Sequence, residues 1–147
     1  MDKKILILDY DVGNIDSILS AVNDVGYQAM LSNKKEDLNS ANKIILPGQG
    51  SFKYGINQIR KYDLEEILKK KVLIEKIPIL GICLGMQLFA TYGHEEGKES
   101  GLDFISGEVK SLDSSIQKLP HIGWNEVNIT KNDHMFNNIE NNSDFYF

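Results

Sequence analysis

Runs of consecutive apolar residues constrain the fold of this chain more than any other feature of its sequence. Three short runs lie at residues 5–8, 44–46 and 77–82. A strand that is apolar on both faces has to be covered on both faces, as in a parallel sheet flanked by helices. Each run is far shorter than the roughly 20 residues that a membrane-spanning helix requires. The runs therefore predict a buried sheet and no membrane segment.

Helical patterns lie between the apolar runs. Asn14 can cap a helix whose apolar residues recur at helical spacing until Gly26 ends it. We expect strands at residues 4–9, 27–31, 43–46 and 77–82, and helices around 56–60, over 64–76 and over 84–92. This alternation predicts an α/β fold, with a mostly parallel sheet and helices on both faces.

The pattern changes after Gly93. Residues 104–109 and 122–129 alternate in a way that predicts strands, and residues 137–144 are Asn-rich and typical of a loop. The last three residues are aromatic and predict the start of another strand. A free carboxylate on a buried strand is costly, and nothing follows to cover this one. We therefore expect residues 1–147 to be one domain that is truncated at its C-terminus.

Composition narrows the possible functions. A chain of 147 residues is long enough for one domain with a real core. Its single cysteine cannot form an internal disulfide or a metal site built on several thiolates, and it fits a reducing compartment. The formal charge of −5 argues against nucleic-acid binding. Because the first strand begins at residue 4, there is no room for a signal peptide, and we expect a cytoplasmic protein.

The most informative segment is Gly-Ile-Cys-Leu-Gly at residues 81–85, between an apolar strand and a helix. A nucleophile at the apex of such a turn takes a strained backbone conformation, and glycines are needed on both sides to avoid collisions. The turn directs the thiol of Cys83 to the helix N-terminus, where unpaired N–H groups favour a thiolate. The N–H of Leu84 then faces an oxyanion formed at the attacked carbon. A small buried cysteine is the alternative, but the paired glycines favour a nucleophile.

A second glycine-rich turn, Pro-Gly-Gln-Gly at residues 47–50, ends another predicted strand. The carboxyl ends of parallel strands share one edge of a sheet, where ligands bind. We expect this turn to lie near Cys83 and to offer a second oxyanion donor. It is neither a P-loop nor a dinucleotide fingerprint, since Lys53 stands where the third glycine would be.

Asp9 and Asp11 support a rival interpretation. Two carboxylates at a strand end could hold Mg²⁺ and transfer a phosphoryl group, as in haloacid-dehalogenase-type phosphatases. This alternative gives the cysteine turn no role, and no matching downstream Asp pair follows. The histidines at positions 94, 121 and 134 include no obvious base for Cys83, and a cysteine nucleophile needs one.

The motifs together resemble the class I (triad) glutamine amidotransferases. Within that class they are most similar to the glutaminase subunits of histidine biosynthesis, through essentially the whole chain. The matching segments are Asp-Tyr-x-x-Gly-Asn (9–14), Leu-Pro-Gly-x-Gly-x-Phe (46–52), Gly-Ile-Cys-Leu-Gly-Met-Gln (81–87), Glu-Glu-Gly (95–97) and Pro-His-Ile-Gly-Trp-Asn (120–125). The resemblance implies the flavodoxin-like fold of that class.

The resemblance also implies a chemistry. Cys83 would attack the carboxamide of glutamine and release ammonia through a thioester that water hydrolyses. Leu84 and the turn formed by Gly48, Gln49 and Gly50 would supply the oxyanion hole. Gln87 and Glu95 would bind glutamine, with Glu95 facing its α-ammonium group. No metal and no cofactor are implied.

A partner is implied as well. His121, Trp124, Asn125 and Tyr146 would lie near the interface with a (β/α)₈-barrel cyclase subunit that receives the ammonia. Without the resemblance, Trp124 would be interpreted as an ordinary core aromatic.

The chain departs from the family pattern at two points. The catalytic His and Glu of the family lie in a Pro-x-x-His-x-Glu segment, which residues 1–147 do not contain. Asp11 stands where the family usually has Gly. Two further alternatives stay open at this point: a paralogous subunit that supplies ammonia for amidination of a surface sugar, and a non-catalytic interaction module that retains the cysteine turn.

Overall fold

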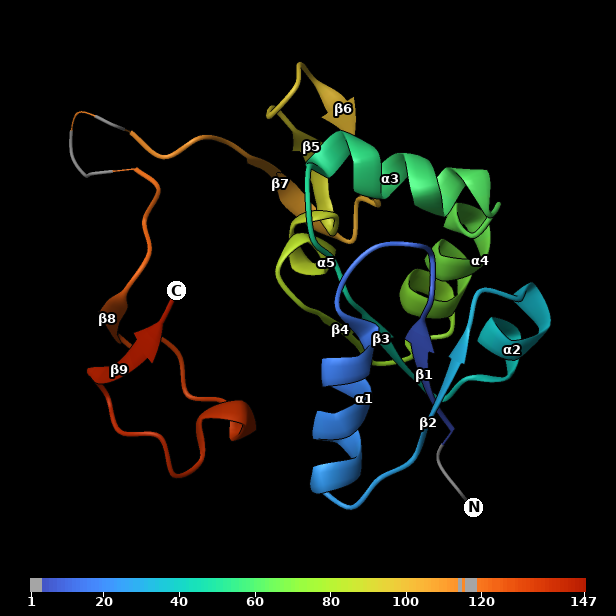
Figure 1. The fold of residues 1–147 in the computed structure, drawn as a ribbon, viewed down its shortest axis with the longest axis horizontal. Helices are drawn as coiled ribbons and strands as arrows, with labels where there is room; N and C mark the ends of the chain where they lie inside the picture. The colour runs from blue at the N-terminus through green and yellow to red at the C-terminus, as the bar shows by residue number, and fades with distance from the viewer. Residues whose placement is uncertain (1–3, 114, 116–118) are drawn as a thin grey trace. The chain divides into compact units, whose positions relative to one another are not determined.

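A computed structural model describes residues 4–113, 115 and 119–147 (Figure 1). The chain divides into two compact units, Met1–Ser111 and Leu112–Phe147. The expectation that the chain has no signal peptide rests in part on residues 1–3, which lie outside the described residues. None of the helices in the described residues is long and apolar enough to cross a membrane.

The first unit is built on a four-stranded parallel sheet in the order β2-β1-β3-β4. Its strands are β1 (Ile5–Leu8), β2 (Ala29–Ser32), β3 (Lys43–Leu46) and β4 (Ile79–Gly81). Three consecutive residues of β1, Leu6, Ile7 and Leu8, are fully buried. The continuous apolar run thus predicted a strand covered on both faces, and this prediction is confirmed.

Helices connect these strands, and a further helix, α5, follows β4. They are α1 (Ile15–Asp24), α2 (Lys35–Ser40), α3 (Phe52–Lys61), α4 (Glu65–Lys69), a π-helical turn at Lys70–Ile74, and α5 (Leu84–Gln87). The connection from β1 to β2 runs in one direction along the sheet, whereas β2 to β3 and β3 to β4 run in the other. Because such crossovers are right-handed, α1 covers one face, and α2, α3 and α4 cover the other. Contacts between α2 and α4 agree with this.

The core of the first unit lies between the sheet and its helices. Strands β1 and β3 contribute Leu6, Leu8, Ile44 and Leu46, all fully buried or nearly so. The helices and loops add Leu38, Phe52, Ile56, Ile59, Leu64, Leu68, Leu84, Leu88 and Leu102. This core holds the carboxyl ends of β3 and β4 in fixed positions.

A smaller three-stranded sheet follows α5. Its strands are β5 (Ala90–Gly93), β6 (Glu99–Ser100) and β7 (Ile105–Val109), in the order β6-β5-β7. The predicted helix over residues 84–92 is therefore wrong beyond Gln87. The carbonyl groups of Leu88 and Phe89 accept hydrogen bonds from the amides of Leu102 and Phe104, at 2.8 Å each. These tertiary contacts, together with Thr91 and Tyr92, favour a strand over continued helix.

The other predicted elements agree with the structure to varying degrees. The strand over 43–46 has the predicted bounds, and Asn14 caps α1 through its Oδ1, which accepts from the amide of Ser17 at 3.4 Å. The predicted helix over 64–76 consists of α4 and the π-helical turn. Helix α2 was not predicted from the sequence, because its six residues include a single buried apolar side chain, Leu38.

The second unit is an antiparallel hairpin with a long connection. Strand β8 (Trp124–Val127) pairs with β9 (Ser143–Tyr146), and a 3₁₀ turn occupies His134–Phe136. The predicted strand start at the final aromatic residues is confirmed, but β9 begins earlier, inside the segment expected to be a loop. The backbone N–H groups of Gly123 and Phe147 donate to each other's carbonyl groups at 3.0 and 2.9 Å, which extends the pairing.

Candidate active site

Cys83 occupies a sharp turn between β4 and α5. Its φ is +54° and its ψ is −117°, a conformation that L-residues rarely adopt. The side chain is exposed. Backbone strain of this kind persists only where the surrounding structure enforces it, and it is concentrated at functional sites. The strained turn predicted from the sequence is confirmed.

The two glycines around Cys83 are required by close backbone contacts. A Cβ on Gly85 would lie 2.0 Å from the carbonyl oxygen of Leu46, and a Cβ on Gly81 would lie 2.6 Å from the Cα of Met86. Either overlap involves backbone, which cannot rotate away as a side chain can. Glycine at both positions is thus a condition for this turn.

The glycine-rich turn at residues 48–50 packs directly against the cysteine turn. Strands β3 and β4 are paired with Leu46 opposite Gly81, and the amide of Ile82 donates to the carbonyl of Leu46 at 3.0 Å. A Cβ on Gly48 would lie 2.4 Å from the backbone nitrogen of Gly85. The prediction that both turns share one edge of the sheet is confirmed.

Unused backbone donors lie in these two turns. In the part of the chain that the structure describes, the N–H groups of Leu84, Gly48, Gln49 and Gly50 donate to no protein acceptor. Leu84 is buried and Gly48 is half-buried, and such amides rarely lack a partner without reason, whereas Gln49 and Gly50 are exposed. Amides beside a nucleophile can stabilise negative charge that develops on a substrate oxygen.

The start of the glycine-rich turn is anchored by Tyr10, which follows β1. The Tyr10 hydroxyl is buried and donates to the carbonyl oxygen of Pro47 at 2.5 Å. Burial raises the pKa of this hydroxyl well above its usual value, so it remains a donor throughout the physiological range. Gly13 supports the same place, since a Cβ there would lie 3.0 Å from the nitrogen of Gly48.

The far end of the turn is anchored by Glu95. Its Oε2 accepts a hydrogen bond from the amide of Phe52, the first residue of α3, at 2.8 Å. Ser51 caps the same helix through its Oγ, which accepts from Tyr54 at 3.4 Å. Gln87, the other residue expected to bind glutamine, ends α5 and is partly buried. No local pattern predicted the contact between Glu95 and Phe52, because the two residues are 43 positions apart.

Arg60, near the end of α3, joins three segments. It bonds to the carboxylates of Glu65 (3.0 Å) and Glu99 (2.8 Å) and to the carbonyl and hydroxyl oxygens of Ser100 (3.0 and 2.6 Å). The hydrogen bond from Arg60 lowers the pKa of Glu99. The sequence alone did not point to Arg60, although Arg60 is the one arginine among 16 basic residues. A planar group with five donors suits such a junction better than lysine.

Asp11, one of the two carboxylates of the phosphatase alternative, is bound by another side chain. Its carboxylate accepts from the Tyr62 hydroxyl at 2.6 Å, and this hydrogen bond lowers the pKa of Asp11. Asp11 has a φ of +63°, which explains why glycine suits this position. Among the described residues, no group of three His, Cys, Asp or Glu side chains could hold a metal ion.

The three histidines contact residues other than Cys83. The Nε2 of His94 lies 3.5 Å from the Glu108 carboxylate, and the His94 amide donates to Val109 at 3.0 Å. The Nε2 of His121 lies 3.1 Å from the side-chain nitrogen of Asn125, and His134 begins the 3₁₀ turn. Both of the latter belong to the second unit.

The four residues predicted to face a partner gather on the hairpin of the second unit. Trp124 pairs with Tyr146 across the two strands, and their rings meet edge-on at 5.6 Å. Both are exposed, by 70% and 62%, so Trp124 is not a core aromatic within its unit. Asn125 and His121 contact each other beside them.

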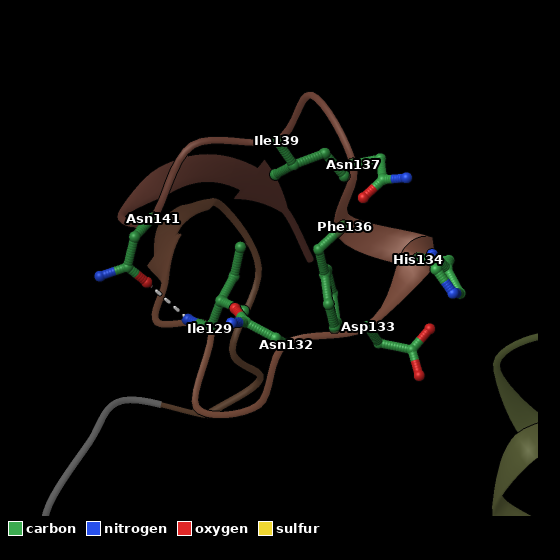
Figure 2. A pocket seen from close by; sticks show the side chains of 8 residues that line it. All are labelled: Ile129, Asn132, Asp133, His134, Phe136, Asn137, Ile139 and Asn141. Atoms are coloured by element: carbon green, nitrogen blue, oxygen red, sulfur yellow. Dashed lines mark hydrogen bonds between the residues drawn. The ribbon is translucent and has the colours of Figure 1, made fainter.

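The connection between β8 and β9, which includes the 3₁₀ turn, forms a pocket in the second unit (Figure 2). It is lined by Ile129, Asn132, Asp133, His134, Phe136, Asn137, Ile139 and Asn141. The amide of Ile129 donates to Oδ1 of Asn141 at 2.6 Å, the contact drawn as a dashed line in Figure 2. The lining combines apolar and amide side chains with the carboxylate of Asp133 and the imidazole of His134.

Comparison with known proteins agrees with these observations. The family described as "Glutamine amidotransferase class-I" matches residues 6–147. "Imidazole glycerol phosphate synthase subunit HisH 1" of Campylobacter jejuni is 44% identical over 144 residues, covering 97% of this chain and 72% of the relative. A HisH subunit of Pelagibacter ubique is 42% identical over 149 residues, with the same coverage.

A solved structure shares the fold. A structure titled "Crystal structure of glutamine amidotransferase" matches with a TM-score of 0.56 and 22% identity, over 66% of this chain and 51% of that one. The chain therefore belongs to the class-I glutamine amidotransferase family, and within it to the HisH subunits of imidazole glycerol phosphate synthase. This assignment replaces the phosphatase alternative.

Proposed function

We propose that this protein is the glutaminase subunit of an imidazole glycerol phosphate synthase. It hydrolyses glutamine to glutamate and delivers ammonia to a cyclase subunit, which uses it to make imidazole glycerol phosphate and AICAR. The observation that carries the proposal is Cys83 at a strained, exposed turn beside unpaired backbone amides. Its relatives are named as subunits of that synthase.

In the proposed reaction, Sγ of Cys83 attacks the carboxamide carbon of glutamine. The carbonyl oxygen takes up negative charge and is bound by the N–H of Leu84 and by the turn of Gly48, Gln49 and Gly50. The C–N bond then breaks, the nitrogen leaves as ammonia after gaining a proton, and a thioester remains. Water attacks the thioester, releases glutamate and restores the thiol. The family's His and Glu, which move these protons, lie in a segment that residues 1–147 do not contain.

Glutamine would be held by Gln87 and Glu95. A carboxylate beside the oxyanion turn suits the α-ammonium group, and the amide of Gln87 suits the α-carboxylate or the side chain. The carboxamide carbon then has to lie within about 3.5 Å of Sγ for attack.

The partner would be a (β/α)₈-barrel cyclase that docks on His121, Trp124, Asn125 and Tyr146. Exposed tryptophan and tyrosine are enriched at protein interfaces, and an edge-to-face pair of them is exposed on this hairpin. We place the complex in the cytoplasm, where histidine would be made.

Glutamate release from glutamine tests the proposal. The 147-residue chain and a version extended to the next in-frame stop codon are each mixed with the cyclase subunit and its nucleotide ligand. We expect turnover in at least the extended chain, and its complete loss in Cys83→Ala. Met86→Leu, an exposed change three residues away, is the matched control and retains turnover.

Turnover that survives Cys83→Ala would contradict the proposal. Absence of turnover in both chains, with the partner present, would instead favour a non-catalytic interaction module. Ammonia transfer to a different acceptor would favour the subunit that supplies amidination of a surface sugar.

A further inference from the structure

Glu95 has a second contact besides the one expected with substrate. Its Oε2 accepts from the amide of Phe52 at 2.8 Å, and Phe52 follows the oxyanion turn by two residues. Gly50, the last residue of that turn, has a φ of +98°, and a Cβ there would meet no atom within 4 Å. The start of the turn packs on the cysteine turn through Gly48, whereas its end at Gly50 depends on what holds the residues that follow it.

The ring of Phe52 is held by the same segment that carries Glu95. Phe52 is buried, and a Cβ on Gly93 would lie 2.4 Å from its ring. Gly93 ends β5, two residues before Glu95. The end of β5 thus holds the phenyl ring of Phe52, and the Glu95 carboxylate holds its amide. A shift of Phe52 would disturb both contacts.

The other end of this segment is fastened to the same helix. Glu99 and Ser100 form β6 and are bound by Arg60, near the end of α3. The segment 95–100 is therefore attached to α3 twice, to its first residue through Glu95 and near its last turn through Glu99 and Ser100. Movement of Glu95 would be transmitted to the first turn of α3 rather than absorbed by a loose loop.

One oxygen of Glu95 is engaged and the other is not. In the described part of the chain, Oε1 has no hydrogen-bond partner, and the residue is exposed. An ammonium group bound at Oε1 would share its carboxylate with the amide of Phe52. A carboxylate can accept at both oxygens at once.

We propose that Glu95 is a positioning residue for the oxyanion turn as well as a ligand for glutamine, and so couples substrate binding to the geometry of that turn. The inference rests on the proposed function. Glutamine bound at Oε1 fixes the carboxylate, the carboxylate holds Phe52 through Oε2, and Phe52 holds the end of the Gly48–Gly50 turn. The enzyme thereby assembles its oxyanion hole most completely when the ammonium group of glutamine is in place.

Two substitutions separate the roles. Glu95→Gln keeps an oxygen that can accept from Phe52 but loses the charge that attracts an ammonium group. Glu95→Ala loses both. Glu96→Gln is the matched control, because Glu96 is an exposed neighbour with no hydrogen bond among the described residues.

The measurements are the steady-state constants for glutamine and the hydrogen exchange of the Phe52 amide, made on the longest chain that turns over together with its cyclase partner. We expect Glu95→Gln to raise KM about tenfold or more, while kcat and Phe52 exchange change less than about threefold. We expect Glu95→Ala to raise KM similarly, to lower kcat about tenfold or more, and to accelerate Phe52 exchange. Glu96→Gln leaves all three quantities unchanged.

Equal kcat and equal Phe52 exchange in the two Glu95 variants would overturn the positioning role, while leaving glutamine hydrolysis intact. Absence of turnover in the unmodified protein would overturn the proposed function. In that case, Phe52 exchange that still responds to Glu95→Ala would reduce Glu95 to a cap of α3. Faster exchange without any loss of kcat would also overturn the coupling.

Discussion

The two units of the chain differ in what holds them together. Every fully buried apolar side chain among the described residues belongs to Met1–Ser111, whereas none of the described residues of Leu112–Phe147 is buried. The first unit has a sheet covered by helices, and the second has one antiparallel hairpin. A two-stranded hairpin alone is at best marginally stable in water.

This difference parallels the division of proposed roles. The residues proposed for chemistry, Cys83 and its neighbouring turns, lie on strand ends that the core of the first unit fixes. The residues proposed for partner binding lie on the second unit, with their aromatic rings exposed. Reacting groups need a rigid support, whereas an interface gains its burial from the partner.

Gly85→Ala is expected to have the largest effect, because it acts where the first unit is most tightly packed. The new Cβ would overlap the Leu46 carbonyl oxygen at 2.0 Å and separate the two turns. We expect destabilisation of about 2–4 kcal/mol and a loss of glutamate release of about 100-fold or more. Urea unfolding and a glutamate assay measure these changes.

The control for this variant is Gly26→Ala. No atom lies within 4 Å of a Cβ there, and only the φ of +82° opposes it. We expect a cost of about 1 kcal/mol and unchanged turnover. Equal effects of the two substitutions would show that the cysteine turn is not held by its packing.

A pair of isoleucine truncations compares the units directly. Ile59 is fully buried in the first unit, whereas Ile122 is 67% exposed in the second. We expect Ile59→Ala to lower the free energy of unfolding by about 2–5 kcal/mol and Ile122→Ala to change it by less than about 0.5 kcal/mol. Similar losses in both variants would mean that the second unit has a core of its own in solution.

Arg60→Met is expected to have a moderate effect that depends on pH. Arg60 lowers the pKa of Glu99, so the folded state holds this proton less tightly than the unfolded state. The contact therefore adds stability above the usual glutamate pKa and loses it as the pH falls through the lowered value. We expect a Tm about 3 °C below that of the unmodified protein at pH 7, with a difference that shrinks in acid.

Lys110→Met serves as the control for this substitution. It removes an exposed partner of Glu108, since 65% of the Lys110 side chain faces solvent. We expect no measurable change in Tm at pH 7. A difference between Arg60→Met and the unmodified protein that stays constant from pH 7 to pH 3 would contradict the assigned role of the Glu99 carboxylate.

Asp11→Gly is expected to have the smallest effect. It removes the hydrogen bond from Tyr62 but relieves the positive φ, and the two changes oppose each other. We expect a Tm within about 3 °C of the unmodified protein and glutamate release within about twofold. A large loss of turnover would show that the loop after β1 takes part in chemistry.

Much of the first unit could be predicted from sequence, because its signals are local. Continuous apolar runs predicted β1, β3 and β4, and Asn14 with Gly26 marked the ends of α1. The glycines on either side of Cys83 predicted the strained turn. In each case the deciding interaction lies within a few residues of the signal.

Features that depend on distant contacts could not be predicted. The helix expected through residue 92 ends at Gln87 because Leu102 and Phe104 bind the carbonyl groups that would have continued it. The bonds from Tyr10 to Pro47 and from Phe52 to Glu95 join residues 37 and 43 positions apart. No local pattern encodes such pairs.

The most direct test of the central claim is labelling of Cys83 by 6-diazo-5-oxo-L-norleucine, a reactive glutamine analogue, in the presence and absence of glutamine. The adduct is located by mass spectrometry, with iodoacetamide labelling as the measure of plain thiol access. Cys83 is the only cysteine of the sequence, which makes the site unambiguous. We predict labelling at Cys83 that glutamine suppresses, while iodoacetamide also reacts. Labelling by iodoacetamide alone, or labelling by the analogue that glutamine never reduces, would contradict a glutamine site at this turn.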